Sequence, residues 1–253
     1  MHADQHVQNV LINHASPSSI QVAQAVIASL TPSLMAWANG HLVEVIPAGS
    51  IAKGTAIKDC SDVDILVSVP ITAKETSQEV YEKLFNRLDA DGFAPHKQNV
   101  SIGMTLSGWK VDVVPAKRQS NLHTVHNIWS NKKKGRRETN IHHHVSHVSS
   151  SGRIEEIRLV KIWKKLHKLE FPSFPLEIAV IKALEDHPFG TVADNFVRVL
   201  EYLRDEFPRV RLVDPTKPSN ILSDELSGEE KSKLSITAGD HLNRNWAEVL
   251  WET

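Results

Sequence analysis

The stretch Leu42–Val69, with the sequence LVEVIPAGSIAKGTAIKDCSDVDILVSV, constrains the fold more than any other part of this chain. An apolar, β-branched run stops at Pro47 and a Gly-Ser pair follows, which predicts a strand and then a turn. A second apolar run begins near Asp62 and predicts another strand. Because side chains alternate across a strand, Asp62 and Asp64 are expected to share one face of it.

Two neighbouring carboxylates repel each other unless a cation neutralises them, and hard oxygen ligands suit Mg²⁺, which usually also binds substrate phosphates. The pair therefore predicts a metal site. The alternative is that both aspartates lie at the solvated start of a strand and bond only to local turns. The preceding segment favours the metal site, since it offers close backbone approach, hydroxyls, amides and a cation for phosphate oxygens, in Gly49, Ser50, Lys53 and Thr55.

The same segment is not a Walker loop. Gly49 and Gly54 have the Walker spacing, but Thr55-Ala56 follows where Lys-Ser or Lys-Thr is required. A P-loop ATPase is therefore not expected.

A third carboxylate lies in a predicted hairpin, whose arms 100–106 and 109–114 are joined by Ser107-Gly108. Asp112 stands between two valines of the second arm. A carboxylate in a buried strand needs a partner, and the metal bound by the first two aspartates would be one. The alternative is an edge strand on which Asp112 faces water.

Gly49-Ser50 followed by Asp62-Val63-Asp64 resembles the signature of the DNA polymerase β-like nucleotidyltransferase superfamily. Within it, GSIAKGTAIKDCSDVDILV is similar to the oligoadenylate synthetases, the bacterial cyclic-oligonucleotide synthases related to cGAS, and the archaeal-type CCA-adding enzymes. The strand Val-Asp-Val-Val-Pro is also similar to the third-carboxylate strand of these families. The resemblance implies that Asp62, Asp64 and Asp112 are catalytic and bind two Mg²⁺ ions, with Mn²⁺ as a substitute. The implied substrate is an NTP, with ATP favoured.

The resemblance continues into the second half of the chain. Arg-Leu-Val-Lys-x-Trp is similar to a family helix whose lysine reaches the triphosphate, which singles out Lys161. The next segment, FPSFPLE, resembles one in which a hydroxyl touches the terminal phosphates, and Ser173 is the matching residue. Ser173 could equally serve only as a helix cap. The turn Asp214–Asn220 also matches the families.

The implied architecture is α+β, with a nucleotidyltransferase palm over residues 1–120 and an α-helical nucleotide- or acceptor-binding domain over residues 121–253. The active site is expected in the cleft between them. Apolar residues at helical spacing predict helices over 16–39, 76–90 and 191–207, and from 154 onward. A capping box at Ser227 and Glu230 predicts a terminal helix that ends near Trp251.

Residues 117–152 are polar, basic and rich in histidine. This segment is either a solvated loop or a contact for polyphosphate or an RNA backbone, such as a tRNA acceptor. The cations concerned are Lys132, Lys133, Lys134, Arg136 and Arg137. The cluster His142, His143, His144 and His147 is not expected to bind a metal, because no Cys or HExxH pattern accompanies it. Its role stays open, and Thr139–His144 matches a family junction before the helical domain.

Composition adds limits but no mechanism. The chain has 253 residues, 41% of them apolar, which is enough for a substantial core. With 29 Lys and Arg against 30 Asp and Glu, any attraction to nucleic acid must come from a local patch. Cys60 is the only cysteine, so neither an internal disulfide nor a Cys-based zinc site can form, and no thiol chemistry is expected of it. No leader and no membrane-spanning run are evident, which favours the cytoplasm.

The function that we expect is template-independent, metal-dependent transfer of a nucleoside monophosphate from an NTP to a hydroxyl, with release of pyrophosphate. The Lys-Gly-Thr loop and the Asp112 strand favour the synthesis of linear or cyclic oligonucleotide signals, as in antiviral defence. One alternative is RNA or tRNA 3′-end addition, although the chain is short for a CCA-adding enzyme. Two others are an antibiotic-modifying transferase and a non-catalytic nucleotide-binding module. Intact aspartates at all three positions argue against the last.

Overall fold

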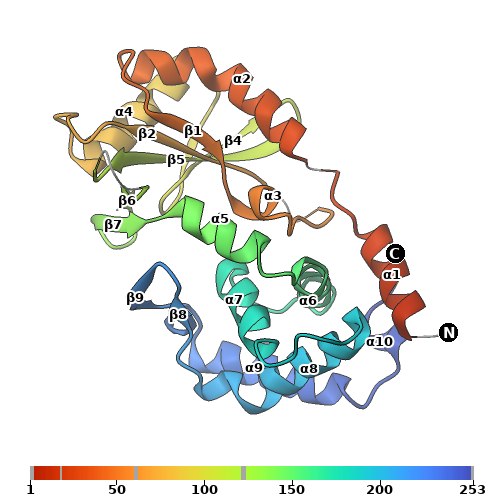
Figure 1. Ribbon diagram of the computed structural model, residues 1–253. Coiled ribbons are helices and arrows are strands. Elements are labelled where there is room, and N and C mark those ends of the chain that lie inside the picture. The colour runs from red at the N-terminus through yellow and green to blue at the C-terminus, as the bar shows by residue number, and fades with distance from the viewer. Residues whose placement is uncertain (1–2, 18, 60–61, 121–123, 252–253) are drawn as a thin grey trace. The chain divides into compact units, whose positions relative to one another are not determined.

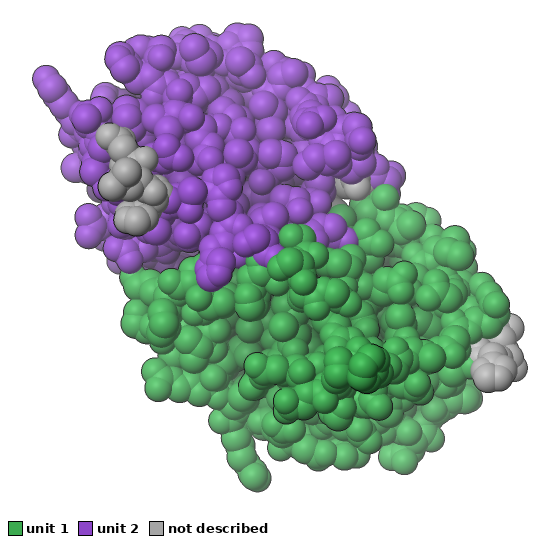
Figure 2. Space-filling view, viewed as in Figure 1, with its two compact units in different colours: residues 1–16, 55–59, 147–253 green, residues 17–54, 60–146 purple. Residues whose placement is uncertain are grey.

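The structure of the protein, a computed structural model, describes residues 3–17, 19–59, 62–120 and 124–251 (Figure 1). Cys60 and Ser61 of the aspartate motif lie outside the described residues. The chain divides into two compact units, coloured in Figure 2. Unit 1 comprises residues 1–16, 55–59 and 147–253, and unit 2 comprises residues 17–54 and 60–146. Unit 2 holds a mixed sheet with flanking helices, which confirms the predicted α+β class.

The sheet of unit 2 is built around one parallel pair of strands. Its order is β1-β2-β5-β4-β3, with β6 paired to the end of β5 and β7 paired to β6. Only β2 and β5 run parallel; the other described pairs are antiparallel. The strands are β1 (Glu44–Pro47), β2 (Val63–Val69), β3 (His96–Lys97), β4 (Ile102–Leu106), β5 (Trp109–Arg118), β6 (His126–Ser130) and β7 (Gly135–Thr139).

Three helices of unit 2 support this sheet: α2 (Ile20–Trp37), α3 (Gly49–Lys53) and α4 (Ser77–Ala90). Helices α2 and α4 contact β2, β5 and each other, and they bury an apolar row that includes Leu30, Leu34, Leu84 and Leu88. Thr76 caps α4 with a complete capping box to Glu79. The helices predicted over 16–39 and 76–90 are thus confirmed, the first beginning later and ending earlier than predicted.

Helix α2 is the one described helix that is long and apolar enough to cross a membrane, by length and composition only. A buried helix of a folded domain passes the same test. Here α2 contacts β1, β2 and α4, and it buries Ala23, Val26 and Leu30 among them. In the structure, 33% of this helix is buried.

Two hairpins shape the sheet. Ser107 and Gly108 have φ values of 51° and 82°, the left-handed conformation that a two-residue hairpin turn needs, so the first predicted hairpin is confirmed. The basic segment forms a second hairpin, β6–β7, which was expected as a loop. In β6 the residues His126, Ile128 and Ser130 are buried in alternation. The sheet thereby continues past residue 120, where the palm was expected to end.

Unit 1 is mainly helical. Its elements are α1 (Ala3–Asn13), α6 (Ile154–Leu166), α7 (Ser173–Ala183), α8 (Val192–Asp205), α9 (Gly228–His241) and α10 (Trp246–Val249), with two short strands, β8 (Val213–Asp214) and β9 (Lys217–Ile221), and 3₁₀ turns at Phe207–Arg209 and Leu222–Glu225. Helix α5 (Ile141–Ser149) spans the point where unit 2 ends in sequence. The core includes Val7, Ile57, Trp163, Phe196 and Leu250.

The end of unit 1 differs in part from the prediction. Ser227 and Glu230 form the expected capping box of α9. The single helix to Trp251 is wrong, because α9 ends at His241 and Asn245 caps a separate short helix, α10. Helix α1, which contacts α6 and α8, was not anticipated, although Ala3, Val7, Val10 and Leu11 stand at helical spacing.

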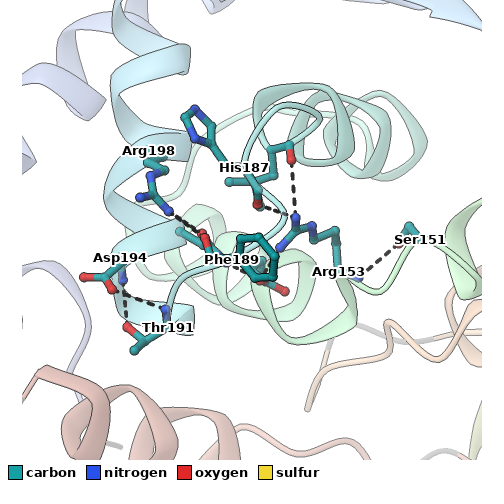
Figure 3. Close-up of polar contacts among 10 residues, drawn as sticks. Ser151, Arg153, His187, Phe189, Thr191, Asp194 and Arg198 are labelled. Atoms are coloured by element: carbon teal, nitrogen blue, oxygen red, sulfur yellow. Dashed lines mark hydrogen bonds and ion pairs between the residues drawn. The ribbon is translucent and has the colours of Figure 1, made fainter.

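Arginine side chains from α8 and from the residue before α6 bind the loop between α7 and α8. Figure 3 shows Arg153 and Arg198 reaching this loop, where they donate hydrogen bonds to the carbonyl oxygens of His187 (2.6 Å) and Phe189 (3.2 Å). Behind it, the buried Asn195 donates through Nδ2 to Glu156 Oε1 (2.8 Å), and its Oδ1 accepts from Arg198 Nη1 (2.9 Å). One amide therefore joins α8, α6 and the loop.

We expect Asn195→Ala to lower the free energy of unfolding by about 1 to 3 kcal/mol, because Glu156 would remain buried without this donor. Asn243→Ala is the matched control, since Asn243 is exposed and its side chain donates to the Gly239 carbonyl. Urea unfolding followed by circular dichroism measures both. Equal losses for the two variants would contradict the structural role of Asn195.

Candidate active site

The parallel register of β2 and β5 places two of the three predicted carboxylates opposite each other. Asp64 pairs with Asp112, and both side chains are half-buried. Their neighbours Val63, Ile65 and Val111 are fully buried and point to the other face of the sheet. Asp62 precedes β2 and is exposed. The flanking valines and isoleucine must be buried on one face of the sheet. Their burial places Asp64 and Asp112 next to each other on the opposite face.

Gly49 lies directly against Asp64. Its φ is +58°, and a Cβ built at this position would stand 1.7 Å from Asp64 Oδ2. The backbone is held there because Ala48 N donates a hydrogen bond to the Asp64 carbonyl (2.8 Å). Only glycine fits a backbone conformation and a space of this kind. The Gly-Ser turn thus packs against a carboxylate.

Asp112 lies in an environment that opposes its ionisation. Burial raises the pKa of the Asp112 carboxyl above its ordinary value, and the charge of Asp62 raises this pKa further. Hydrogen bonds act in the opposite direction: Gln98 Nε2 donates to Asp112 Oδ1 (2.9 Å), and Ser101 Oγ lies 3.5 Å from Oδ2. The influence of Asp62 on this pKa indicates that the two carboxyl groups are near each other.

These residues fit a magnesium site by their chemistry. Three carboxylates supply hard oxygen ligands, and the mutual repulsion between Asp62 and Asp112 is the condition that a cation relieves. Within the described ranges, no three His, Cys, Asp or Glu side chains already converge in the geometry of a formed metal site. The metal-binding role of Asp62, Asp64 and Asp112 stays a prediction.

The predicted phosphate contacts of unit 1 form a buried polar cluster. Lys161 Nζ donates to Glu177 Oε1 (2.6 Å) and to Thr55 Oγ1 (2.8 Å), and it lies 3.3 Å from the Thr55 carbonyl. Thr55 Oγ1 donates in turn to Glu177 Oε1 (2.8 Å). All three residues are buried. The acceptor Glu177 was not singled out from the sequence.

The other predicted phosphate-binding residues lie at helix ends. In unit 2, Ser50 is the second residue of α3 and is half-buried, and Lys53 is its buried last residue. In unit 1, Ser173 is the exposed first residue of α7. The N-cap residue of α7 is Pro172, which makes no side-chain capping hydrogen bond. Roles for Ser50, Lys53, Thr55, Lys161 and Ser173 toward a nucleotide remain predictions.

The histidine-rich segment forms the start of α5. His142 Nε2 lies 2.5 Å from Glu44 Oε1, and the buried His126 Nε2 lies 3.2 Å from Glu44 Oε2. Burial lowers the pKa of His126, while the charge of Glu44 opposes this effect. Glu44 of β1 is thus the residue that His142 and His126 share. Glu44 and His142 are 98 positions apart in the sequence, so their contact could not be anticipated from it.

A cavity of about 380 Å³ in unit 2 lies away from the carboxylates. It is lined by residues such as Trp37, His41, Val69 and Lys83, at the carboxyl end of β2. Asp62 and Asp64 lie at the amino end of the same strand. The candidate active site is therefore identified by the carboxylates, and this cavity is not part of it.

Sequence reasoning missed the residues around Asp112. Gln98 and Ser101 contact its carboxylate, and Gly103 pairs with Asp112 across β4 and β5. A glycine within a predicted strand signals a close approach by other atoms. That signal at Gly103 was available in the sequence.

Gly49→Ala tests the packing of the turn against Asp64. We expect Mg²⁺-dependent incorporation of AMP from ATP to fall at least about 100-fold, because the new methyl group would displace a reacting-site carboxylate. Gly92→Ala is the control, since Gly92 also has a positive φ, +83°, but open space around it. Gly92→Ala should lower the unfolding free energy by about 1 to 2 kcal/mol through backbone strain alone, and Gly49→Ala should lower it further because its methyl group also clashes with Asp64. Equal activities would contradict the assigned contact.

Comparisons with known proteins give a family match over this part of the chain. The family model described as "Nucleotidyltransferase domain" matches residues 35–141, a range that includes all three aspartates. The chain is 25% identical to the cyclic AMP-AMP-AMP synthase of Escherichia coli (strain MS 115-1), over 71% of this chain and 68% of the relative.

Solved structures show the same fold. The structure of E. coli CdnC with ATP superposes with a TM-score of 0.78 at 20% identity, over 98% of this chain and 97% of the other. A Cid1 poly(U) polymerase bound to MgATP gives a TM-score of 0.71 at 15% identity, over 100% and 99% of the two chains. The chain therefore carries a nucleotidyltransferase domain, and the protein is a nucleotidyltransferase enzyme related to the cyclic AMP-AMP-AMP synthase of E. coli.

Proposed function

We propose that the protein joins nucleotides from NTPs, ATP among them, into linear or cyclic oligonucleotide signals of the antiviral-defence type. The observation that carries this proposal is the register of β2 and β5, which sets Asp64 opposite Asp112 beside the Gly49 turn. The product class is supported by the related E. coli protein, which is named a cyclic AMP-AMP-AMP synthase. We propose the cytoplasm as its location.

In the proposed reaction, the oxygen of an acceptor hydroxyl attacks the α-phosphorus of an NTP. A new P–O bond forms, the bond to pyrophosphate breaks, and the hydroxyl proton is lost. Mg²⁺, with Mn²⁺ as a substitute, would be bound by Asp62, Asp64 and Asp112 and would neutralise charge on the phosphates and the attacking oxygen. Asp112, the carboxyl group whose pKa burial raises, is the candidate to accept the hydroxyl proton.

Unit 2 would serve as the palm that positions the carboxylates, Ser50 and Lys53. Within unit 1, Lys161, Thr55 and Ser173 are the candidates for contact with phosphates. Lys161 Nζ has three N–H donors and already faces three acceptor atoms. A triphosphate would therefore have to displace one of these contacts. We expect this exchange to involve Thr55, because the Glu177 contact is an ion pair.

The alternative function is addition of nucleotides to RNA. It is favoured by the basic β6–β7 hairpin and by the fold shared with the Cid1 poly(U) polymerase. Lys132, Lys133 and Lys134 are exposed at the hairpin turn, and Arg136 is exposed on β7. These cations could contact a phosphate backbone without any base-specific contact. A non-catalytic module is not consistent with the enzyme assignment above.

Incubation of the protein with Mg²⁺ and each labelled NTP, with and without total tRNA, tests the proposal. We expect small oligonucleotides from the wild type and at least about a 1,000-fold loss in an Asp62→Ala, Asp64→Ala double variant, because both metal-binding carboxylates are removed. An Asp89→Ala, Asp186→Ala variant, which removes two exposed carboxylates elsewhere, should retain the activity. If the label is found only in RNA, the proposal of signal synthesis is wrong and the alternative, nucleotide addition to RNA, takes its place.

The basic hairpin separates the two functions. Lys132→Glu with Lys133→Glu should leave RNA-free synthesis of small products unchanged under the main proposal, since these side chains are exposed on the hairpin turn. Under the alternative, the same change should weaken transfer to RNA about tenfold or more at low salt, with a smaller effect at high salt. The control is Lys231→Glu with Lys233→Glu on α9. If the hairpin variant, but not the control, loses synthesis of small products in the absence of RNA, the hairpin takes part in that synthesis and this prediction is wrong.

A further inference from the structure

We propose that Gln98 is a positioning residue of the active site, which orients the Asp112 carboxylate through its side-chain amide. The inference rests on the proposed function, in which Asp112 helps to bind the metal. It goes beyond that function because it assigns a role to a residue outside the three carboxylates. All of the atoms involved belong to unit 2.

The side chain of Gln98 is fixed from both ends of its amide. Nε2 donates to Asp112 Oδ1 (2.9 Å), and Oε1 accepts from the hydroxyl of Ser101 (2.8 Å). Because an ionised carboxylate only accepts hydrogen bonds, the NH₂ group is the end that faces Asp112, and the Ser101 hydroxyl then donates to Oε1. Nε2 also lies 3.4 Å from His96 Nε2. The amide therefore has one orientation that satisfies its neighbours.

The backbone of Gln98 is fixed as well. Gln98 N donates to the Ser101 carbonyl (3.1 Å), and the Gln98 carbonyl accepts from Asn131 Nδ2 (2.7 Å). The buried Tyr81 hydroxyl lies 2.8 Å from the Ser101 carbonyl and 3.3 Å from that of Gln98. A side chain on a loop tied at this many points can hold a partner in one rotamer.

Gly103 provides the space that this arrangement needs. It pairs with Asp112 across β4 and β5. A Cβ at Gly103 would stand 2.5 Å from Gln98 Nε2 and 2.4 Å from His96 Nε2. Gln98 and His96 therefore lie over the strand directly beside Asp112, in a volume that any other residue at position 103 would occupy.

The carboxylate needs such a donor. Asp112 is half-buried, and without a hydrogen bond its carboxylate would be free to rotate. The donor at Oδ1 holds the carboxylate in one orientation, and Ser101 Oγ lies 3.5 Å from Oδ2. Outer hydrogen-bond partners of metal-binding carboxylates typically change metal affinity or activity about 10-fold to 100-fold when removed.

The test compares Gln98→Met and Gln98→Glu, which keep the length of the side chain and remove the donor. Gln119→Met is the matched control, since the Gln119 amide also donates to a neighbouring side chain in unit 2, Asn127 Oδ1 (2.8 Å). Mn²⁺ affinity is measured by electron paramagnetic resonance in the presence of a non-hydrolysable α,β-methylene analogue of ATP. Thermal unfolding of the metal-free protein and steady-state kcat and KM for ATP are measured on the same samples.

We expect both Gln98 variants to weaken Mn²⁺ binding about 10-fold to 100-fold and to lower kcat by a similar factor, with KM for ATP unchanged. Ser101→Ala should show a smaller loss of the same kind, and Ser101→Thr should restore it by returning the hydroxyl. A purely structural role would lower the melting temperature and leave Mn²⁺ affinity and kcat unchanged below it.

Variants at Gln98 that match Gln119→Met in Mn²⁺ affinity and kcat would overturn the inference. An Asp112→Ala sample distinguishes this result from failure of the proposed function. If Asp112→Ala weakens Mn²⁺ binding and the Gln98 variants do not, only the role of Gln98 is wrong. If Asp112→Ala binds Mn²⁺ as the wild type does, the metal-binding role of Asp112 and the role of Gln98 are both wrong.

Discussion

The parallel pairing of β2 with β5 is the constraint on which the active site depends. Val63, Ile65 and Val111 are completely buried on one face, so a shift of either strand by one residue would expose them. That apolar requirement fixes the register, and the register brings Asp64 opposite Asp112. The placement of two mutually repelling carboxylates is therefore supported by hydrophobic burial on the other side of the same strands.

Local patterns account for the part of the structure that the sequence predicted. The aspartate strand, the Ser107-Gly108 turn and the capping box at Ser227 each depend on neighbouring residues, and each is found as predicted. The β6–β7 hairpin was missed because five cations within seven residues obscured the alternating burial of His126 and Ile128. Charge density is a property of the exposed turn, and it says little about the strands on either side.

The surroundings of the candidate site could not be predicted in the same way. Gln98 meets Asp112 only because β4 and β5 form a hairpin beside β3, and Glu177 meets Thr55 from 122 positions away. The polar residues that make these contacts do not follow the regular spacing by which helices and strands are recognised in a sequence. Buried polar groups must find partners, but which partner is chosen depends on the tertiary packing. The carboxylates were recognisable from the sequence, whereas the residues that orient them were not.

The discontinuity of the two units has a consequence for how the chain folds during synthesis. Unit 2 needs residues only up to 146, so its sheet can be assembled while the ribosome is still adding the helices that follow. The first helix has no such opportunity: α1 packs on α6 and α8, and His6 Nε2 lies 2.6 Å from the Leu250 carbonyl. The residues of α1 are thus synthesised before the helices on which they pack, and until those helices exist the apolar side of α1 must be kept from other partners.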